Sequence, residues 1–160
     1  MRRLSASLFL CAAALSAAPA NDEQTIRAMY DRYAQAVKVR DLKTILAFYA
    51  PEIVAFDAYP PRQYTGIAAY RKDYEDFFAA FPGPITSKVG DLHVTASGSI
   101  AYVYGVDNWM VTDKDGKAFT LAFRFTDVLR KMNGKWLIVH EHLSFPVDPE
   151  TGKADFFSKP

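Results

Sequence analysis

The stretch KAFTLAFRFTDVLRKMNGKWLIVHEHLSF, residues 117–145, decides the fold class. Its two halves, 117–131 and 135–145, are rich in β-branched and aromatic residues, which favour extended strands. Asn133-Gly134 stands between the halves, and this dipeptide is typical of a tight turn between antiparallel strands. The stretch therefore predicts a β-hairpin that ends near residue 145.

The segments before this hairpin extend the pattern. Strands are expected at 85–95 and 100–111, with turn residues at 96–99 and 113–116, so four consecutive strands form an antiparallel meander. A separate strand is expected at EIVAFDA, residues 52–58, before a Pro-rich loop. Helices first and a meander later indicate an α+β fold.

Three amphipathic helices are expected in the first half of the chain. Apolar residues recur at the spacing of one helix face in the segments 26–37, 42–49 and 67–81. Asp22 and Asp41 are candidate N-caps of the first two helices, and Pro51 is expected to end the second. A curved sheet wrapped over three helices makes a cone, whose open end encloses a pocket for a small ligand.

The N-terminal segment has the features of a secretory signal peptide. Arg2 and Arg3 precede an apolar run, and Ala18-Pro19-Ala20 matches a cleavage site. We expect residues 1–20 to be removed, a domain over 21–145 and an extended tail over 146–160. The protein would then be periplasmic or secreted, with no membrane segment, and without its only cysteine, Cys11.

The composition excludes several classes of protein. Half of the residues are hydrophobic, which excludes wholesale disorder. Lys and Arg number 19 against 18 Asp and Glu, and this balance argues against a nucleic-acid partner. Aromatic residues make up 14% of the chain, enough for a core and for an aromatic-lined pocket.

Three segments carry a family resemblance: residues 33–42, residues 49–66 with their opening Tyr-Ala-Pro-Glu, and residues 127–136. They resemble the NTF2-like superfamily, which includes SnoaL-like proteins and ketosteroid isomerases. Residues 134–144, GKWLIVHEHLS, are also similar to the association domain of calmodulin-dependent kinase II, which shares this fold. The resemblance implies a cone of three helices on a curved antiparallel sheet, a homodimer, a small hydrophobic ligand and no cofactor.

Asp57 is the first candidate catalytic residue. It shares a strand face with Ile53 and Ala55, and a carboxyl group that continues an apolar face has a raised pKa, as a general base requires. The alternative is an Asp that organises the following turn. The resemblance implies the base, because Asp57 stands at the place of the isomerases' catalytic Asp.

Two further residues are candidates for holding a substrate oxygen. Tyr33 lies on the apolar face of the first helix, and Asp127 ends the apolar strand face that runs from Phe119 to Phe125. The resemblance implies that Tyr33 and a protonated Asp127 donate hydrogen bonds to this oxygen. It also implies that Tyr74 orients Tyr33, with Tyr70, one helical turn earlier, as the alternative. The alternatives are a core tyrosine and a surface ion pair.

The remaining candidates lie on the strands. Tyr104 and Glu141 are expected to face inward as substrate contacts. His140 and His142 share a strand face, which the resemblance places on the outer, dimer-forming side; an alternation shifted by one residue brings His140 into the pocket. A zinc site at this pair lacks an evident third ligand, so no metal is expected.

Two functions remain open from these residues. The first is an exported protein that binds a small hydrophobic molecule and moves a proton next to its carbonyl group, in the manner of ketosteroid isomerases or SnoaL-like cyclases. The second is a non-catalytic module for ligand binding or oligomerisation. Whether the protein is an enzyme is not decided by the sequence, because one fold hosts many functions.

Overall fold

The computed structural model describes residues 19–156. Residues 1–18 and 157–160, and with them most of the predicted signal peptide and the last residues of the tail, lie outside the described residues. The elements are, in chain order, α1 (Pro19–Lys38), α2 (Leu42–Leu46), β1 (Tyr49–Phe56), β2 (Tyr64–Thr65), α3 (Ile67–Ala80), β3 (Thr86–Ser97), β4 (Ile100–Thr112), β5 (Ala118–Met132) and β6 (Lys135–Ser144). No helix among the described residues is long and apolar enough to cross a membrane.

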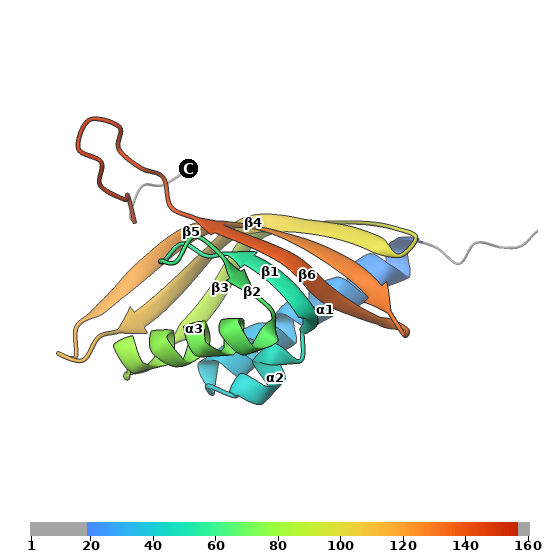
Figure 1. Cartoon of the computed structure of the whole chain (residues 1–160), viewed down its shortest axis with the longest axis horizontal. Coiled ribbons are helices and arrows are strands. Elements are labelled where there is room, and N and C mark those ends of the chain that lie inside the picture. Colours follow the sequence, from blue (N-terminus) through green and yellow to red (C-terminus); the bar gives the residue numbers. More distant parts are fainter. Residues whose placement is uncertain (1–18, 157–160) are drawn as a thin grey trace, which may run out of the picture.

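The strands form one curved sheet in the order β2-β1-β6-β5-β4-β3 (Figure 1). The antiparallel meander of β3 to β6 is confirmed, and β1 joins it in parallel beside β6. Asn133 and Gly134 both adopt positive φ, 50° and 79°, as a tight hairpin turn requires. Helices α2 and α3 lie below the sheet in this view, and α1 runs behind the sheet from its right end towards α2. The α+β cone is therefore confirmed.

The boundary between α2 and β1 differs from the prediction. We expected a helix through Tyr49 that ends at Pro51, but α2 ends at Leu46 and Tyr49 already pairs with Ile138 of β6. The helical spacing at Tyr49 is overridden by this strand pairing. Pro51 lies inside β1 where the register shifts, a place where the missing N–H is tolerated. The two-residue strand β2 lies within the segment that was expected to be a loop.

The two predicted caps have different outcomes. Asp41 caps α2, because its side chain accepts a hydrogen bond from the backbone N–H of Thr44 at 3.1 Å. Asp22 does not cap α1, since the helix begins three residues earlier at Pro19. Instead its carboxylate accepts hydrogen bonds from Lys131 at 2.7 Å and Trp136 at 3.1 Å, which fasten α1 to the β5–β6 hairpin.

The tail after β6 is not extended. Val147 and Ala154 form a β-bridge that closes a short loop, seen in red at one end of the sheet (Figure 1). The ring of Phe156 packs edge-on against that of Phe145, with 4.6 Å between centroids. The tail therefore folds back onto the end of β6.

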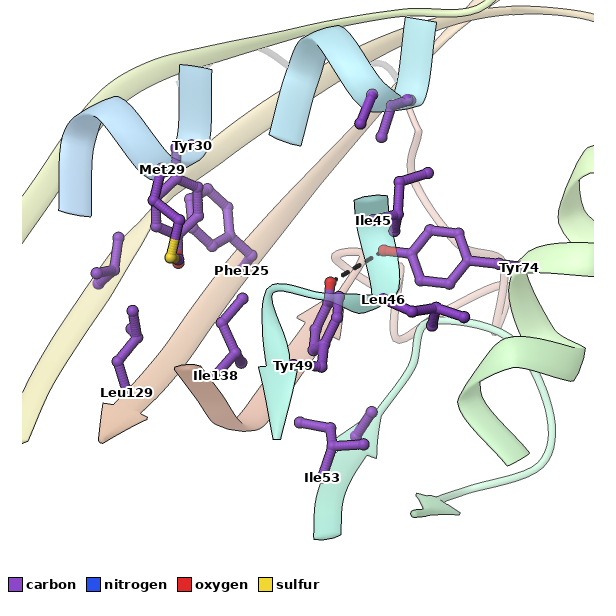
Figure 2. Packing of buried hydrophobic residues seen from close by; sticks show 14 of the residues in the cluster. Met29, Tyr30, Ile45, Leu46, Tyr49, Ile53, Tyr74, Phe125, Leu129 and Ile138 are labelled. Carbon is purple, nitrogen blue, oxygen red and sulfur yellow. Dashed lines mark hydrogen bonds between the residues drawn. The ribbon is translucent and has the colours of Figure 1, made fainter. Parts of the chain in front are cut away.

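The core lies between the helices and the concave face of the sheet. Figure 2 shows apolar side chains from α1, α2, β1, β5 and β6 meeting there, among them Ile45, Ile53 and Leu129, which are completely buried. Arg40, two residues after the end of α1, donates to the carbonyl oxygen of Phe78 at 3.1 Å. This contact fixes α3, which supplies one wall of the pocket described next.

Candidate functional site

A cavity of about 270 Å³ lies between the helices and the sheet. That volume is near the lower end for ligand pockets, about 300–1,000 Å³. Tyrosine, phenylalanine and tryptophan side chains dominate its wall. Six carboxyl groups also line it: Asp57, Asp73, Asp76, Asp107, Asp127 and Glu141. No Lys, Arg or His of the described residues belongs to this lining, so the pocket has acidic groups and no basic ones.

Alternation along β5 carries Asp127 into this cavity. Leu121, Phe125 and Leu129 are buried on the same face of the strand, and the Asp127 side chain stands between the last two at 1% exposure. The Tyr30 hydroxyl, from α1, donates a hydrogen bond to Asp127 Oδ2. The other oxygen, Oδ1, is buried and has no hydrogen-bond partner among the described residues. The surface ion pair considered for Asp127 therefore does not form.

Burial makes Asp127 a carboxyl group that holds a proton near neutral pH. Its pKa is raised to about 7, chiefly by desolvation, while the hydrogen bond from Tyr30 lowers it and the nearby Asp107 raises it. A neutral carboxyl whose Oδ2 accepts from Tyr30 has its proton on Oδ1. Asp127 can then donate a hydrogen bond to an acceptor inside the pocket.

Four hydroxyl groups and one carboxyl group form a second polar cluster. Glu141 Oε2 lies 3.1 Å from the Tyr49 hydroxyl, and Oε1 accepts from the Tyr70 hydroxyl. The Tyr49 and Tyr74 hydroxyls are 2.9 Å apart, the contact dashed in Figure 2, and those of Tyr74 and Tyr33 are 2.5 Å apart. The contact implied for Tyr33 and Tyr74 is thus present, and it continues to Glu141.

Glu141 also holds its proton near neutral pH. Burial raises its pKa to about 8; the charge of Asp57 raises it further, and the hydrogen bond with Tyr49 lowers it. Burial likewise raises the pKa of the Tyr33, Tyr49 and Tyr74 hydroxyls above the ordinary value. All three hydroxyls therefore keep their protons in the physiological range.

Asp57 follows the last residue of β1 and lines a less buried part of the pocket. Its Oδ1 accepts a hydrogen bond from the backbone N–H of Tyr59 at 3.0 Å, so it organises the turn and faces the pocket at once. Burial raises its pKa, and the backbone N–H groups of Tyr59 and Ala58 lower it. The pKa of Asp73, on α3, is raised to about 6 by burial and by the charge of Asp57.

Asp107 is held differently from the other carboxyl groups described above. Ser87 donates to its two oxygens at 3.0 and 2.9 Å, and the indole N–H of Trp109 donates to Oδ2 at 2.7 Å. Its pKa is raised by burial and lowered by these hydrogen bonds. Because both of its oxygens accept hydrogen bonds from the protein, Asp107 has less freedom to bind a ligand than Asp127.

Two candidate substrate contacts do not line the pocket: Tyr104, which was expected to face inward, and His140, for which the pocket was the alternative to the outer side. Tyr104 is 44% exposed on the outer face of the sheet, where its ring stacks on His93 with 4.7 Å between centroids. The odd-numbered residues of β4 face inward, so Tyr104 faces outward. His140 Nδ1 lies 2.8 Å from the carbonyl oxygen of Val54, and its ring packs on Phe56. His142 packs on the same ring, and no group of three metal-ligating side chains occurs among residues 19–156.

Several polar lining residues were not named as site residues by sequence reasoning, among them Tyr30, Tyr49, Asp73 and Asp107, whereas Tyr70 was named as the alternative to Tyr74. Two of the missed residues could have been found from the sequence. Tyr30 lies on the same helical stripe as Tyr33, and Asp107 stands two residues before a buried tryptophan on an alternating strand. Tyr49 carried no such signal, because it was expected in a helix.

Comparisons with known proteins agree with this architecture. An NTF2-like protein of unknown function from Pseudomonas putida KT2440 is 35% identical over 88% of this chain and 98% of its own, with a TM-score of 0.81. A ketosteroid isomerase-like protein from Erwinia carotovora atroseptica is 21% identical over 77% and 95%, with a TM-score of 0.66. The association domain of C. elegans CaMKII is 20% identical over 79% and 97%, with a TM-score of 0.62. A comparison with curated proteins finds no match.

The family follows from a match along most of the chain. The model of the SnoaL-like domain covers residues 26–148, from the first buried residue of α1 to the start of the folded tail. All six carboxyl groups of the pocket lie inside this range, and so do Tyr33, Tyr49, Tyr70 and Tyr74 of the second polar cluster. The protein therefore belongs to the SnoaL-like family, whose members have the NTF2-like fold.

Proposed function

We propose that the pocket binds a small hydrophobic carbonyl compound and transfers a proton at the carbon next to the carbonyl group. The observation that carries this proposal is the Asp127 carboxyl group. It is buried and holds a proton near neutral pH, and its Oδ1 atom has no hydrogen-bond partner among residues 19–156 in a pocket lined by aromatic rings. A carbonyl oxygen is the acceptor that completes this group.

The remaining groups supply the other parts of the reaction. Asp57 takes a proton from the α carbon, and the carbonyl oxygen gains negative charge as the enolate forms. Hydrogen bonds from Asp127 and Tyr33 stabilise that oxygen. The protonated Asp57 then returns the proton to the γ carbon of an unsaturated substrate, which moves the double bond into conjugation. Asp57 is suited to this role because it lines the same pocket and has a raised pKa.

Two further properties belong to this proposal. Export to the periplasm or the outside of the cell is supported by the signal-peptide pattern of residues 1–20. A homodimer that pairs the outer faces of two sheets is supported by exposed apolar side chains there, including Tyr102 at 48% and Tyr104 at 44% exposure. The structural similarity to the association domain of C. elegans CaMKII also supports assembly of this protein into an oligomer.

The direct test is ultraviolet-monitored isomerisation by the mature protein. A β,γ-unsaturated ketosteroid and a smaller β,γ-unsaturated cyclohexenone are the two substrates, since the cavity is small. We expect conjugation with the wild type and a loss of about 10²–10⁴-fold in Asp57→Asn. Glu52→Gln is the matched control, because Glu52 is an exposed carboxyl group on β1, the strand that Asp57 follows. Equal rates in wild type and Asp57→Asn contradict the assignment, and no turnover of either substrate favours the non-catalytic module.

A further inference from the structure

We infer that Glu141 is a positioning residue: the proton on its carboxyl group sets whether Tyr33 offers the pocket a hydrogen-bond donor or an acceptor. This inference rests on the proposed function, in which Tyr33 donates a hydrogen bond to the carbonyl oxygen of the substrate. The hydroxyl directions themselves exist without turnover, so they can be tested in the free protein.

The geometry is an unbroken chain of four groups. It runs from Glu141 Oε2 to Tyr49 at 3.1 Å, on to Tyr74 at 2.9 Å and on to Tyr33 at 2.5 Å (Figure 2 shows the middle contact). Tyr70 occupies the other carboxyl oxygen, so it stands outside the chain. Each hydroxyl has one proton to donate, and the direction of one bond therefore dictates the direction of the next.

An ionised Glu141 makes Tyr33 an acceptor. The carboxylate can only accept, so the Tyr49 proton points at Oε2. Tyr49 must then accept from Tyr74, and Tyr74 must accept from Tyr33. The single proton of Tyr33 is used inside the protein, and only its oxygen lone pair faces the pocket.

A neutral Glu141 reverses all three bonds. With the Oε1 atom accepting from Tyr70, the carboxyl proton lies on Oε2 and is donated to Tyr49. Tyr49 then donates to Tyr74, and Tyr74 donates to Tyr33. The Tyr33 proton is released for a ligand, so one proton on Glu141 changes the polarity of a hydroxyl three bonds away.

The groups that face Glu141 favour the neutral state while the base is ionised. Asp57, at the end of β1, raises the pKa of Glu141 by its charge, and Tyr49 of β1 lowers it. Asp127 is the register partner of Glu141 on β5. The tyrosine hydroxyl groups around Glu141 come from two helices. Tyr70 and Tyr74 belong to α3, and Tyr30 and Tyr33 belong to α1. An ionised Asp57 therefore coincides with a donating Tyr33, which is the pair of states that enolate formation needs.

The test observes the hydroxyls directly in the ligand-free protein. Tyrosine labelled with ¹³C at Cζ reports a change of hydrogen-bond direction as a change of chemical shift. In wild type, we expect the signals of Tyr33, Tyr49 and Tyr74 to step together at one midpoint near pH 8, where Glu141 ionises. In Glu141→Gln, whose amide donates to Tyr49 at every pH, the step is absent. No step at Tyr33 in wild type, or the same step in Glu141→Gln, would overturn the role.

Three further variants separate the chain from its surroundings. Tyr49→Phe cuts the chain, so the step at Tyr33 and Tyr74 is lost; its persistence there would overturn the role. Asp57→Asn keeps the joint step and lowers its midpoint, which distinguishes Glu141 from the base as its source. Tyr70→Phe keeps the joint step and raises its midpoint, because the ionised carboxylate loses a donor. These outcomes require no turnover, so they stand or fall separately from the isomerase assay.

Discussion

The Tyr30 hydroxyl donates to Asp127 Oδ2 at the buried wall of the pocket, and Asp127 Oδ1 has no partner among the described residues. The hydrogen bond to Oδ2 fixes the position of the carboxyl group, and Oδ1 stays available for a hydrogen bond with a ligand. This pairing explains why an acidic residue can end an apolar strand face: the fold tolerates a neutral carboxyl where a charged one would be costly.

Removing the Tyr30 hydroxyl tests that pairing. Tyr30→Phe is expected to lower the free energy of unfolding by about 1–3 kcal/mol. The loss should be larger at about pH 9 than at about pH 5, because a hydrogen bond to a carboxylate is stronger than one to a neutral carboxyl. Urea denaturation at the two pH values measures it, with Tyr102→Phe on the exposed face as control. A loss that is the same at both pH values would contradict the pairing.

The pH dependence of stability follows from the raised pKa values. Asp127, with a pKa near 7, and Glu141, near 8, bind more protons in the folded than in the unfolded protein, where carboxyl pKa values are about 4. The stability that they contribute is fully present below about pH 4 and is lost as the pH rises through 7 and 8.

Thermal melting should therefore show a falling Tm between about pH 5 and pH 9. Asp127→Asn and Glu141→Gln should each flatten part of this slope, since each removes one titrating group. A Tm that rises across this range, or a slope that neither variant changes, would contradict the protonation states on which the proposed chemistry depends.

The pocket should discriminate against anions. Its lining has six carboxyl groups and, among the described residues, no basic side chain. An anionic ligand meets repulsion in a site of low dielectric constant, so a naphthalene carboxylate should bind at least about tenfold more weakly than its methyl ketone counterpart. Calorimetric titration compares the two. Asp73→Asn should narrow the difference, and equal affinity for both ligands in wild type would refute the electrostatic account.

The outer face of the sheet gives a prediction for assembly. Replacing Tyr102 and Tyr104 by Glu places charge on the exposed apolar surface and should reduce the sedimenting mass from two chains to one. Lys114→Glu, in the turn between β4 and β5, is the control that changes charge without touching that surface. A wild type that sediments as a single chain, or a double variant that remains dimeric, would show that this face is not the interface.

The meander could be predicted from local sequence, because Asn133-Gly134 fixes the last hairpin through neighbours along the chain. The Asp41 cap could be predicted in the same way, because it lies within a few residues of the helix that it begins. Alternation from Phe119 to Phe125 put Asp127 on the apolar face of β5, but it left open whether the carboxyl group reaches solvent. The position of Asp127 in the pocket was implied by the family resemblance.

The errors arose where distant pairing decides the outcome. Tyr49 contacts Glu141 across 92 residues because β1 adds to β6 in parallel, and nothing in the helical spacing around Tyr49 signals this. In a regular strand Ile138 and Glu141 would face opposite sides, because they are three positions apart. A register shift between β5 and β6 lets both face the pocket. Tyr104 was misplaced because β4 carries apolar residues on both faces, so its composition does not reveal which face is buried.

Deuterium exchange tests the central claim, proton transfer next to a carbonyl, most directly. A cyclic ketone that fits the cavity is incubated with the mature protein in D₂O, and proton NMR follows the loss of the α-proton signal. The account predicts exchange that is catalysed by wild type, retained in Glu52→Gln and reduced by about 10²-fold or more in Asp57→Asn. Exchange at the uncatalysed rate in the presence of a ketone that calorimetry shows to be bound would contradict it, and the pocket would then be one that binds without turning over.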